Sequence, residues 1–359
     1  YADRYFSTSN ESSQIAGPYC FGSCENCEMQ NMSLSFDGDD DYVSVPYNAS
    51  LNSFEDGLTV TAWIKLSSAD GLKTILENGN EKGFTFLVNP SGELYTNVQN
   101  QSGWSSIYSG ATLALNQWYN VALTYYPGVI RLYIDGSLVN EGNNASGNII
   151  NNDGDLWIGR YHDYDNHFPG YIDQVSIWAD ALTESEIQEN MYNDLIGFED
   201  GLVGYWSFND GDGDVLTDFS GNGNHGTING ATWSNDVLQP PHTGPEWFVS
   251  EGGSDENNGS VDYPFATIQY AINSANNGDS VFVGPGTYVE NIDLSGRSLG
   301  LISTDGSEST IIDGGQNGRV VTYDNPNNPD LYSRIDGFTI RNGSWSGAGA
   351  GILIYYGQM

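Results

Sequence analysis

The sequence has few basic residues. It carries 10 Lys and Arg against 47 Asp and Glu in 359 residues, a formal net charge of −37. Such a field repels phosphate backbones and anionic membrane surfaces, so we expect no nucleic-acid partner. The chain also lacks any apolar run close to the roughly 20 residues that span a bilayer, which argues against membrane insertion. The excess of carboxylates suits calcium, which prefers hard oxygen ligands.

Cysteine is almost absent, and all three thiols, Cys20, Cys24 and Cys27, lie close together. Their CxxxCxxC spacing is that of the iron–sulfur motif of radical SAM enzymes. Those enzymes need an α/β barrel, whereas strands and turns are predicted here for the following 200 residues. A zinc site would need a fourth ligand, and none is nearby. We therefore expect one disulfide between two of the three cysteines, in a leader or linker over residues 1–32 of an exported protein.

Aromatic residues make up 13% of the sequence, and glycine is abundant, with 45 residues. The aromatic content argues against disorder, and the glycines mark many tight turns. Residues 58–66 alternate, with Leu58, Val60 and Ile64 on one face and Thr61 and Trp63 on the other, which predicts a half-buried strand. Further strands are predicted at residues 83–88, 93–98, 118–125, 130–134, 156–159, 171–178, 201–208 and 227–233. Such a series is typical of an antiparallel sandwich or barrel.

Two helices interrupt the strands. Thr183 and Glu186 form a capping-box pattern that predicts a short helix to Asn193. After a Pro-rich linker over residues 237–246, residues 263–276 are apolar at helical spacing. Beyond that helix, apolar pairs recur, which suggests the stacked coils of a solenoid. The pairs are Val281/Val283, Leu299/Leu301 and Val320/Val321, followed by Ile340.

Residues 33–236 resemble the laminin-G-like, concanavalin A-like jelly-roll family. The resemblance rests on residues 36–43 (FDGDDDYV), 58–66 (LTVTAWIKL), 118–121 (WYNV), 132–136 (LYIDG) and 170–178 (GYIDQVSIW). Segments like residues 204–208 and 218–227 usually lie at the start of such domains, whereas here they lie at the end. We expect either a circular arrangement with adjacent terminal strands or a truncated second copy, and we favour the first.

Residues 247–359 resemble the start of right-handed parallel β-helix proteins of the pectate-lyase type. The matching residues are 247–250 (WFVS), 264–272 (PFATIQYAI), 283–288 (VGPGTY) and 335–340 (IDGFTI). The expected fold is therefore all-β: an antiparallel jelly-roll β-sandwich followed by the N-terminal cap and first coils of a parallel β-helix. The last strand, over residues 351–357, is expected to be an unpaired edge.

Calcium is the cofactor that the jelly-roll resemblance implies. Asp173 is predicted to share the apolar face of Val175 and Ile177, where an ionised carboxylate needs a partner. The family places calcium between this strand and the Asp-Gly turn. The implied ligands are Asp37, Gly38, Asp41 and Asp173, with Asp218 and Asn222 as further candidates. The alternative is a hydrogen-bonded Asp173 beside a solvated turn; the acidic turn over residues 210–214 is read as flexible.

Sugar recognition uses aromatic platforms beside polar groups. The candidate ligand residues are Trp104, Tyr108, Tyr161, His162 and Tyr164, all expected in loops. Paired carboxylates occur throughout a chain with 47 acidic residues and so carry no information. No Ser/His/Asp set or glucanase strand motif stands out, so catalysis is not predicted for this segment.

The function indicated is a secreted or cell-surface bacterial binding module, directed at a glycan or another extracellular polymer. One alternative is the targeting part of a polysaccharide lyase or hydrolase with catalytic rungs beyond Met359. Another is an adhesin stalk without a ligand.

Overall fold

The computed structural model describes residues 31–355, except 56, 80–81, 144–145, 151–152, 163–165, 194, 325–332 and 348. Residues 1–30 of the predicted leader, with its cysteine cluster, and Tyr164 lie outside the described residues. The chain divides into two compact units, the first ending at Leu238 and the second beginning at Gln239. None of the helices among the described residues has the length and apolar character needed to cross a membrane.

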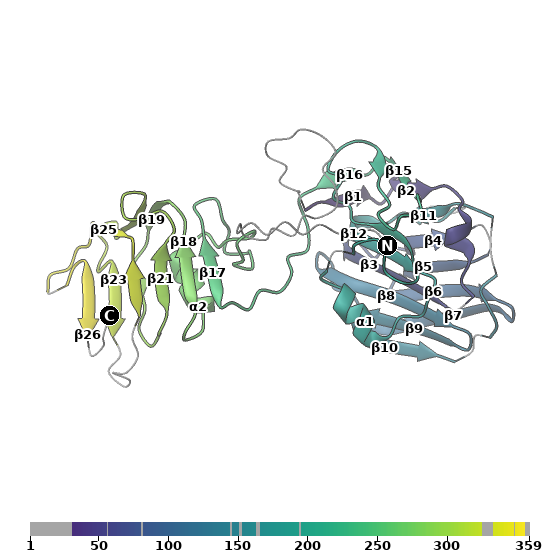
Figure 1. Cartoon of the computed structure of the whole chain (residues 1–359), viewed down its shortest axis with the longest axis horizontal. Coiled ribbons are helices and arrows are strands. Elements are labelled where there is room, and N and C mark those ends of the chain that lie inside the picture. Colours follow the sequence, from purple (N-terminus) through teal and green to yellow (C-terminus); the bar gives the residue numbers. More distant parts are fainter. Residues whose placement is uncertain are drawn as a thin grey trace, which may run out of the picture. The chain divides into compact units, whose positions relative to one another are not determined.

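The first unit contains two antiparallel sheets of eight strands (Figure 1). The first sheet comprises β1 (Ser33–Asp37), β3 (Leu58–Leu66), β8 (Trp118–Tyr126), β9 (Val129–Ile134), β10 (Ser137–Gly142), β12 (Pro169–Trp178), β13 (Leu202–Trp206) and β16 (Thr232–Ser234). The second comprises β2 (Tyr42–Val45), β4 (Lys73–Asn78), β5 (Phe84–Val88), β6 (Glu93–Asn100), β7 (Gly103–Thr112), β11 (Leu156–Ile158), β14 (Val215–Leu216) and β15 (Gly226–Asn229).

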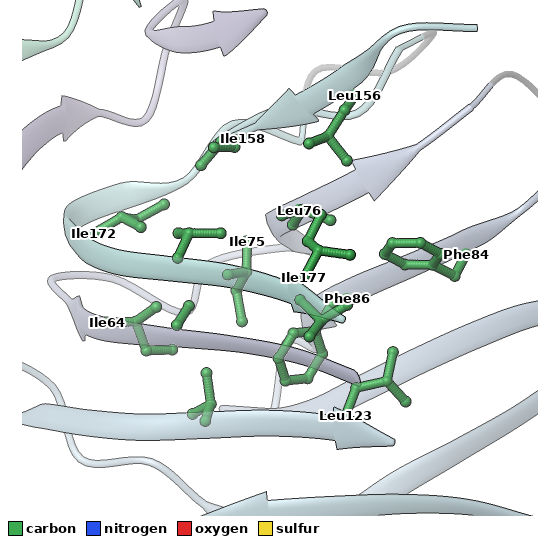
Figure 2. Packing of buried hydrophobic residues seen from close by; sticks show 14 of the residues in the cluster. Ile64, Ile75, Leu76, Phe84, Phe86, Leu123, Leu156, Ile158, Ile172 and Ile177 are labelled. Carbon is green, nitrogen blue, oxygen red and sulfur yellow. The ribbon is translucent and has the colours of Figure 1, made fainter. Parts of the chain in front are cut away.

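The core of this unit lies between the two sheets. Figure 2 shows Ile64, Leu123 and Ile172 of the first sheet with Phe84 and Phe86 of the second. The predicted alternation of β3 is confirmed, because its residues 58, 60, 62, 64 and 66 all belong to this core. An antiparallel sandwich is therefore the observed fold of the first unit.

The closing strands of the unit lie beside its opening strands. β16 pairs with β1, with Trp233 opposite Leu34, and β15 pairs with β2, with Ile228 opposite Val43. The predicted circular arrangement is thus confirmed. The single predicted strand over residues 227–233 is in fact two strands, one in each sheet.

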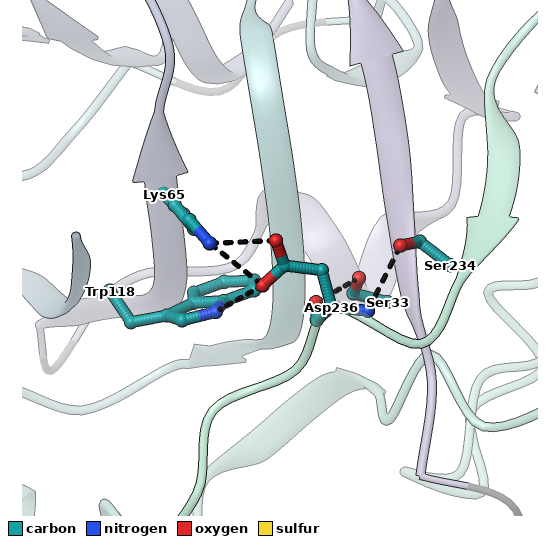
Figure 3. A network of polar contacts seen from close by, with 5 residues as sticks. All are labelled: Ser33, Lys65, Trp118, Ser234 and Asp236. Carbon is teal, nitrogen blue, oxygen red and sulfur yellow. Dashed lines mark hydrogen bonds and ion pairs between the residues drawn. The ribbon is translucent and has the colours of Figure 1, made fainter. Parts of the chain in front are cut away.

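Asp236 fastens this closing segment to the outer face of the first sheet (Figure 3). Its carboxylate accepts hydrogen bonds from Lys65 Nζ at 2.6 and 2.9 Å and from Trp118 Nε1 at 3.1 Å. Its backbone carbonyl accepts a bond from Ser33 Oγ, and its backbone N–H donates to Ser234 Oγ. These contacts tie three strands of the sheet to the end of the domain.

A bulge in β12 changes the predicted orientation of Asp173. The pairing with β3 shifts between Asp173 and Ser176, and Gln174 has a φ of 46°. Val175 belongs to the core, whereas Asp173 lies opposite Trp63 on the outer face of the first sheet. The prediction that Asp173 shares the face of Val175 is therefore wrong, because the extra residue reverses the alternation.

Helix α1 (Glu184–Asn190) covers part of the outer face of the first sheet. The predicted capping box is confirmed: Thr183 accepts a bond from the backbone of Glu186, and the Glu186 carboxylate accepts one from Thr183 N at 2.7 Å. The helix ends three residues before the predicted Asn193. Ile187 packs into a second cluster with Trp178 and Tyr205. A short 3-10 helix, η1 (Ala49–Asn52), follows β2.

The second unit contains three parallel sheets, which the chain visits in turn. The first has β17 (Glu246–Val249), β18 (Ser280–Val283), β21 (Gly300–Ser303) and β24 (Arg334–Asp336). The second has β19 (Gly286–Val289), β22 (Thr310–Asp313) and β25 (Thr339–Arg341), and the third has β20 (Ile292–Asp293), β23 (Val321–Asp324) and β26 (Ile352–Tyr355). β26 pairs with β23, and its Ile352 and Ile354 are exposed.

The predicted stacking of apolar pairs is correct only for its first step. Val281 stacks on Leu301, but Leu301 stacks on Ile335. Val321 belongs to another sheet, between Ile292 and Ile352. Each coil contributes one strand to each of the three sheets, and these strands are unequally spaced along the chain. A single spacing in the sequence therefore connects residues that belong to different sheets.

Helix α2 (Ile268–Ser274) is shorter than the predicted helix over residues 263–276. Its start is displaced because Phe265 forms a parallel bridge with Val249, which takes residues before Thr267 out of the helix. The predicted apolar face is confirmed, since Phe265, Ile268, Ile272 and Ala275 all lie in the core of the second unit.

Candidate binding site

A row of outward-facing side chains crosses the second sheet of the sandwich. Residues directly opposite each other on neighbouring strands share a face of the sheet. The residues next to them along each strand, such as Leu76, Phe86 and Val98, point into the core. The row therefore faces away from the core. Its members are Ser44, Trp157, Glu77, Thr85, Asn97 and Ser106, in the order β2–β11–β4–β5–β6–β7.

The middle of this row is covered by the segment after β11. Glu77 is 1% exposed, and its carboxylate accepts bonds from His162 N at 2.7 Å and lies 2.6 Å from His162 Nδ1. The Arg160 guanidinium lies 4.5 Å from the ring centre of Tyr42 and 4.8 Å from that of Trp157. This part of the sheet face is filled by the protein itself.

The end of the face over β6 and β7 is open. Tyr95 and Tyr108 lie opposite each other and stack, with ring centroids 4.4 Å apart and planes 14° apart. Tyr108 is 48% exposed, and Trp104, on the same face of β7, is 49% exposed. Asn97 Oδ1 accepts bonds from Tyr95 OH at 2.7 Å and Ser106 Oγ at 2.5 Å. We name these five residues the β7 platform.

The platform is rigid for a surface site. Asn97 Nδ2 donates to Thr85 Oγ1 at 3.2 Å, so the amide that orients Tyr95 and Ser106 is itself held by β5. Partial desolvation, and then the neighbouring Tyr95, raise the pKa of the Tyr108 hydroxyl above its usual 10. Tyr108 is therefore neutral over the physiological range. The platform offers flat ring faces with fixed hydroxyl and amide groups between them.

The predicted ligand residues fall into two groups. Trp104 and Tyr108 lie on strand β7, not in a loop as expected, and share one exposed face. Tyr161 and His162 follow β11, stack on each other, and lie beside Glu77. The sequence reasoning missed Tyr95, although the alternation of residues 93–98 indicates that it faces outward.

The acidic turn after β1 brings three carboxylates together. Asp37, Asp40 and Asp41 have oxygens that all lie within 4.8 Å of one another. Asp37 Oδ1 accepts a bond from Asp39 N at 2.8 Å, and Asp41 Oδ2 accepts one from Asp37 N at 2.9 Å. Asp41 is buried, which raises the pKa of its carboxyl group. Gly38 has a φ of 84° and packs on Pro169, leaving no room for a side chain there.

The other implied calcium ligands lie elsewhere. Asp37 pairs with Pro169 of β12, and Asp173 lies four residues further along that strand, about 13 Å away at the rise of an extended chain. The Asp218 carboxylate accepts bonds from the backbone of Tyr205, Ser220 and Asn224 at 2.7–3.0 Å and so closes its own loop. Within the described part of the chain, only the turn after β1 gathers three possible metal ligands.

Asn222 and the turn over residues 210–214 are also engaged locally. Asn222 Nδ2 donates to Val203 O at 3.2 Å. Asp210 Oδ2 accepts a bond from Thr217 N at 3.0 Å, and Trp233 Nε1 donates to Gly213 O. Both segments therefore have structural contacts of their own.

A small cavity lies under α1, lined in part by Thr61, Trp63, Asn120 and Ser176. Its volume is about 20 Å³, room for about one water molecule. Asn120 Oδ1 is buried and has no hydrogen-bond partner among the described residues. The cavity is too small for a sugar, so the β7 platform is the better candidate site.

Comparison with known families gives a match over much of the sandwich. Residues 37–188 match the concanavalin A-like lectin/glucanases superfamily (Laminin_G_3), a segment that contains the whole β7 platform. Residues 251–295, in the second unit, match a family described only as a protein of unknown function (DUF1565). Comparison with curated proteins finds no match.

Several solved structures are similar to part of the chain. A protein from Bacteroides ovatus ATCC 8483, provisionally named as carbohydrate binding, is 23% identical over 57% of this chain and 60% of its own, with a TM-score of 0.48. A heptameric pentraxin from Limulus polyphemus is 20% identical over 45% of this chain and 82% of its own, with a TM-score of 0.36. The binding domain of Paraclostridial Mosquitocidal Protein 1 is 17% identical over 44% of this chain and 45% of its own, with a TM-score of 0.38.

Proposed function

We propose that the sandwich is a secreted or cell-surface module that binds carbohydrate through the β7 platform. The observation that carries this proposal is the pair of aromatic surfaces, Tyr95–Tyr108 and Trp104, on one face of the neighbouring strands β6 and β7. Flat ring faces suit the C–H faces of sugars, and fixed polar groups beside them suit sugar hydroxyls. The superfamily matched by residues 37–188 includes lectins, which is consistent with this role.

A glycan array followed by titration of each hit tests this proposal. The Trp104→Ala variant is expected to bind about 10- to 100-fold more weakly than the wild type, the loss expected for an aromatic anchor. Tyr126, which is 57% exposed at the end of β8 in the other sheet, provides a matched control through Tyr126→Ala. Equal losses in both variants, or no glycan bound by the wild type, would contradict the proposal.

We further propose that calcium binds at Asp37, Asp40 and Asp41 and stabilises the sandwich. Calcium–oxygen distances of about 2.4 Å allow one ion to bridge oxygens up to about 5 Å apart, which the turn satisfies. Such an ion would supply only charge neutralisation and rigidity to the turn.

Thermal unfolding with calcium and with a chelator tests the metal site. Calcium is expected to raise the Tm of the wild type and of Asp212→Asn, an exposed carboxylate in the other acidic turn. Asp40→Asn should lose the effect. A wild-type Tm that is the same with calcium and with chelator would remove calcium from the account.

For the second unit, we propose the N-terminal part of a right-handed parallel β-helix of the pectate-lyase type. The support is that the chain passes through three parallel sheets in a repeating order and that α2 packs beside β17 and β18 of the first. A crystal structure of the protein tests the handedness; a left-handed path between successive coils would contradict it.

A further inference from the structure

The β7 platform lies in a part of the sheet that has almost no charge. Strands β5, β6 and β7 together carry one ionisable acid or base other than tyrosine, Glu93, and no Lys or Arg. The Glu93 carboxylate accepts a bond from Asn89 Nδ2 at 2.9 Å, and its charge acts on Tyr108. A carboxylate or sulfate on a ligand needs a cationic partner to offset its lost hydration, and the platform offers a negative charge instead.

Three of the five Lys and Arg residues described in the sandwich are engaged by acids, aromatic rings or carbonyl groups; the other two are Lys73 of β4 and the exposed Lys82 just before β5. Lys65 pairs with Asp236 and Arg131 with Glu141 at 2.6 and 2.7 Å. Arg160 lies on Tyr42 and Trp157, at the far end of the row, where it also donates to two backbone carbonyl groups. The net charge of −37 adds a field that repels any polyanion during approach.

The arrangement of the rings fixes how a chain of sugars would lie. Tyr108 and Trp104 are four residues apart on the same face of β7, about 13 Å along the strand. Ser106 lies between them, with its hydroxyl held by Asn97. This geometry suits an extended ligand that runs along β7, places two separate sugar units on the rings and passes its hydroxyls over Ser106.

The end of this path beyond Tyr108 is open. A Cβ atom added at Gly110, two residues beyond Tyr108 on the same face of β7, would meet no other atom within 4 Å. A bound polymer can therefore continue past Tyr108. Resting on the carbohydrate-binding role proposed above, we infer that the ligand is an uncharged, extended polysaccharide lying along β7, in preference to a uronate-containing or sulfated one.

The inference is tested by comparing pairs of soluble polysaccharides that share a backbone but differ in charge. Hydroxyethyl cellulose with carboxymethyl cellulose is one pair, and carboxyl-reduced polygalacturonate with polygalacturonate is another. In affinity electrophoresis at fixed ionic strength, the neutral member of a pair is expected to bind at least about tenfold more tightly. Tyr126→Ala serves as the control variant.

The outcomes separate this inference from the function on which it rests. If the acidic member binds equally well or better, and Trp104→Ala weakens that binding, the platform is a glycan site but the inference about charge is wrong. If no polysaccharide or array glycan binds, the proposed function fails and the inference fails with it.

Oligosaccharides of increasing length, from two to six units of the neutral glycan that binds, test the path along β7. Affinity should rise until the oligosaccharide reaches both rings and then level off. The Trp104→Ala variant should lose this rise with length while keeping the weak binding of the disaccharide at Tyr95 and Tyr108. An affinity that does not depend on length, or a rise that survives Trp104→Ala, would overturn the proposed path.

Discussion

Glu290 is a partly buried carboxylate in the second unit, next to the start of α2. Its oxygens accept bonds from Ile268 N at 2.9 Å and Gln269 N at 3.0 Å. Burial is the main cause that raises the pKa of this group above its usual 4.5, and these two bonds oppose the rise. The charged form is therefore less favoured in the folded protein than in the unfolded chain.

This carboxylate makes the stability of the second unit depend on pH. The contribution of Glu290 to the free energy of unfolding is fully present below the pKa that the group has in the unfolded chain. It is lost as the pH rises through the higher pKa that the group has in the folded protein. We expect the Tm of the wild type to fall between about pH 4 and 7 relative to that of Glu290→Gln, which cannot ionise. The exposed Glu256→Gln provides the control. A constant difference between wild type and Glu290→Gln over this range would contradict the assignment.

Gly170 shows why one position at the start of β12 accepts no side chain. It has a φ of 130°, and an added Cβ would lie 2.0 Å from Lys65 O, which is backbone and cannot move aside. We expect Gly170→Ala to lower the free energy of unfolding by more than about 3 kcal/mol. Gly71→Ala, at a φ of 85° with nothing within 4 Å, should cost only about 1 kcal/mol. Urea denaturation of the two variants measures the difference.

At the scale of elements, α1 depends on its cap because it has only seven residues. The Glu186 carboxylate accepts bonds from the backbone and hydroxyl of Thr183, which lowers its pKa. We expect Thr183→Ala to cost about 1 kcal/mol, the usual contribution of a helix N-cap. Ser185→Ala, an exposed change in the same helix, should be nearly neutral. Equal unfolding midpoints for the two variants in urea would show that the cap is unimportant here.

The elements also show what sequence patterns can and cannot predict. The alternation of β3 and the capping box at Thr183 are local properties, and both were predictable. The bulge at Gln174 is not local, because it depends on how β12 pairs with β3, and it turned Asp173 to the opposite face. Tyr95 was missed for a similar reason: only the pairing of β6 with β7 places it against Tyr108.

The whole molecule consists of two units with separate cores. Each core is formed by residues of its own unit, so we expect residues 31–238 to fold without the rest. Far-UV circular dichroism and a cooperative thermal transition of that fragment would check this. A fragment without a cooperative transition would show that the sandwich depends on the second unit or on residues 1–30.

Binding along β7 is the central claim, and isothermal titration with the bound glycan tests it most directly. The three proteins to compare are the wild type, the double variant Trp104→Ala/Tyr108→Ala and the control Tyr126→Ala. We predict that the double variant binds at least about 100-fold more weakly, a loss of about 3 kcal/mol, while the control binds like the wild type. Unchanged affinity in the double variant, with its Tm preserved, would contradict the account.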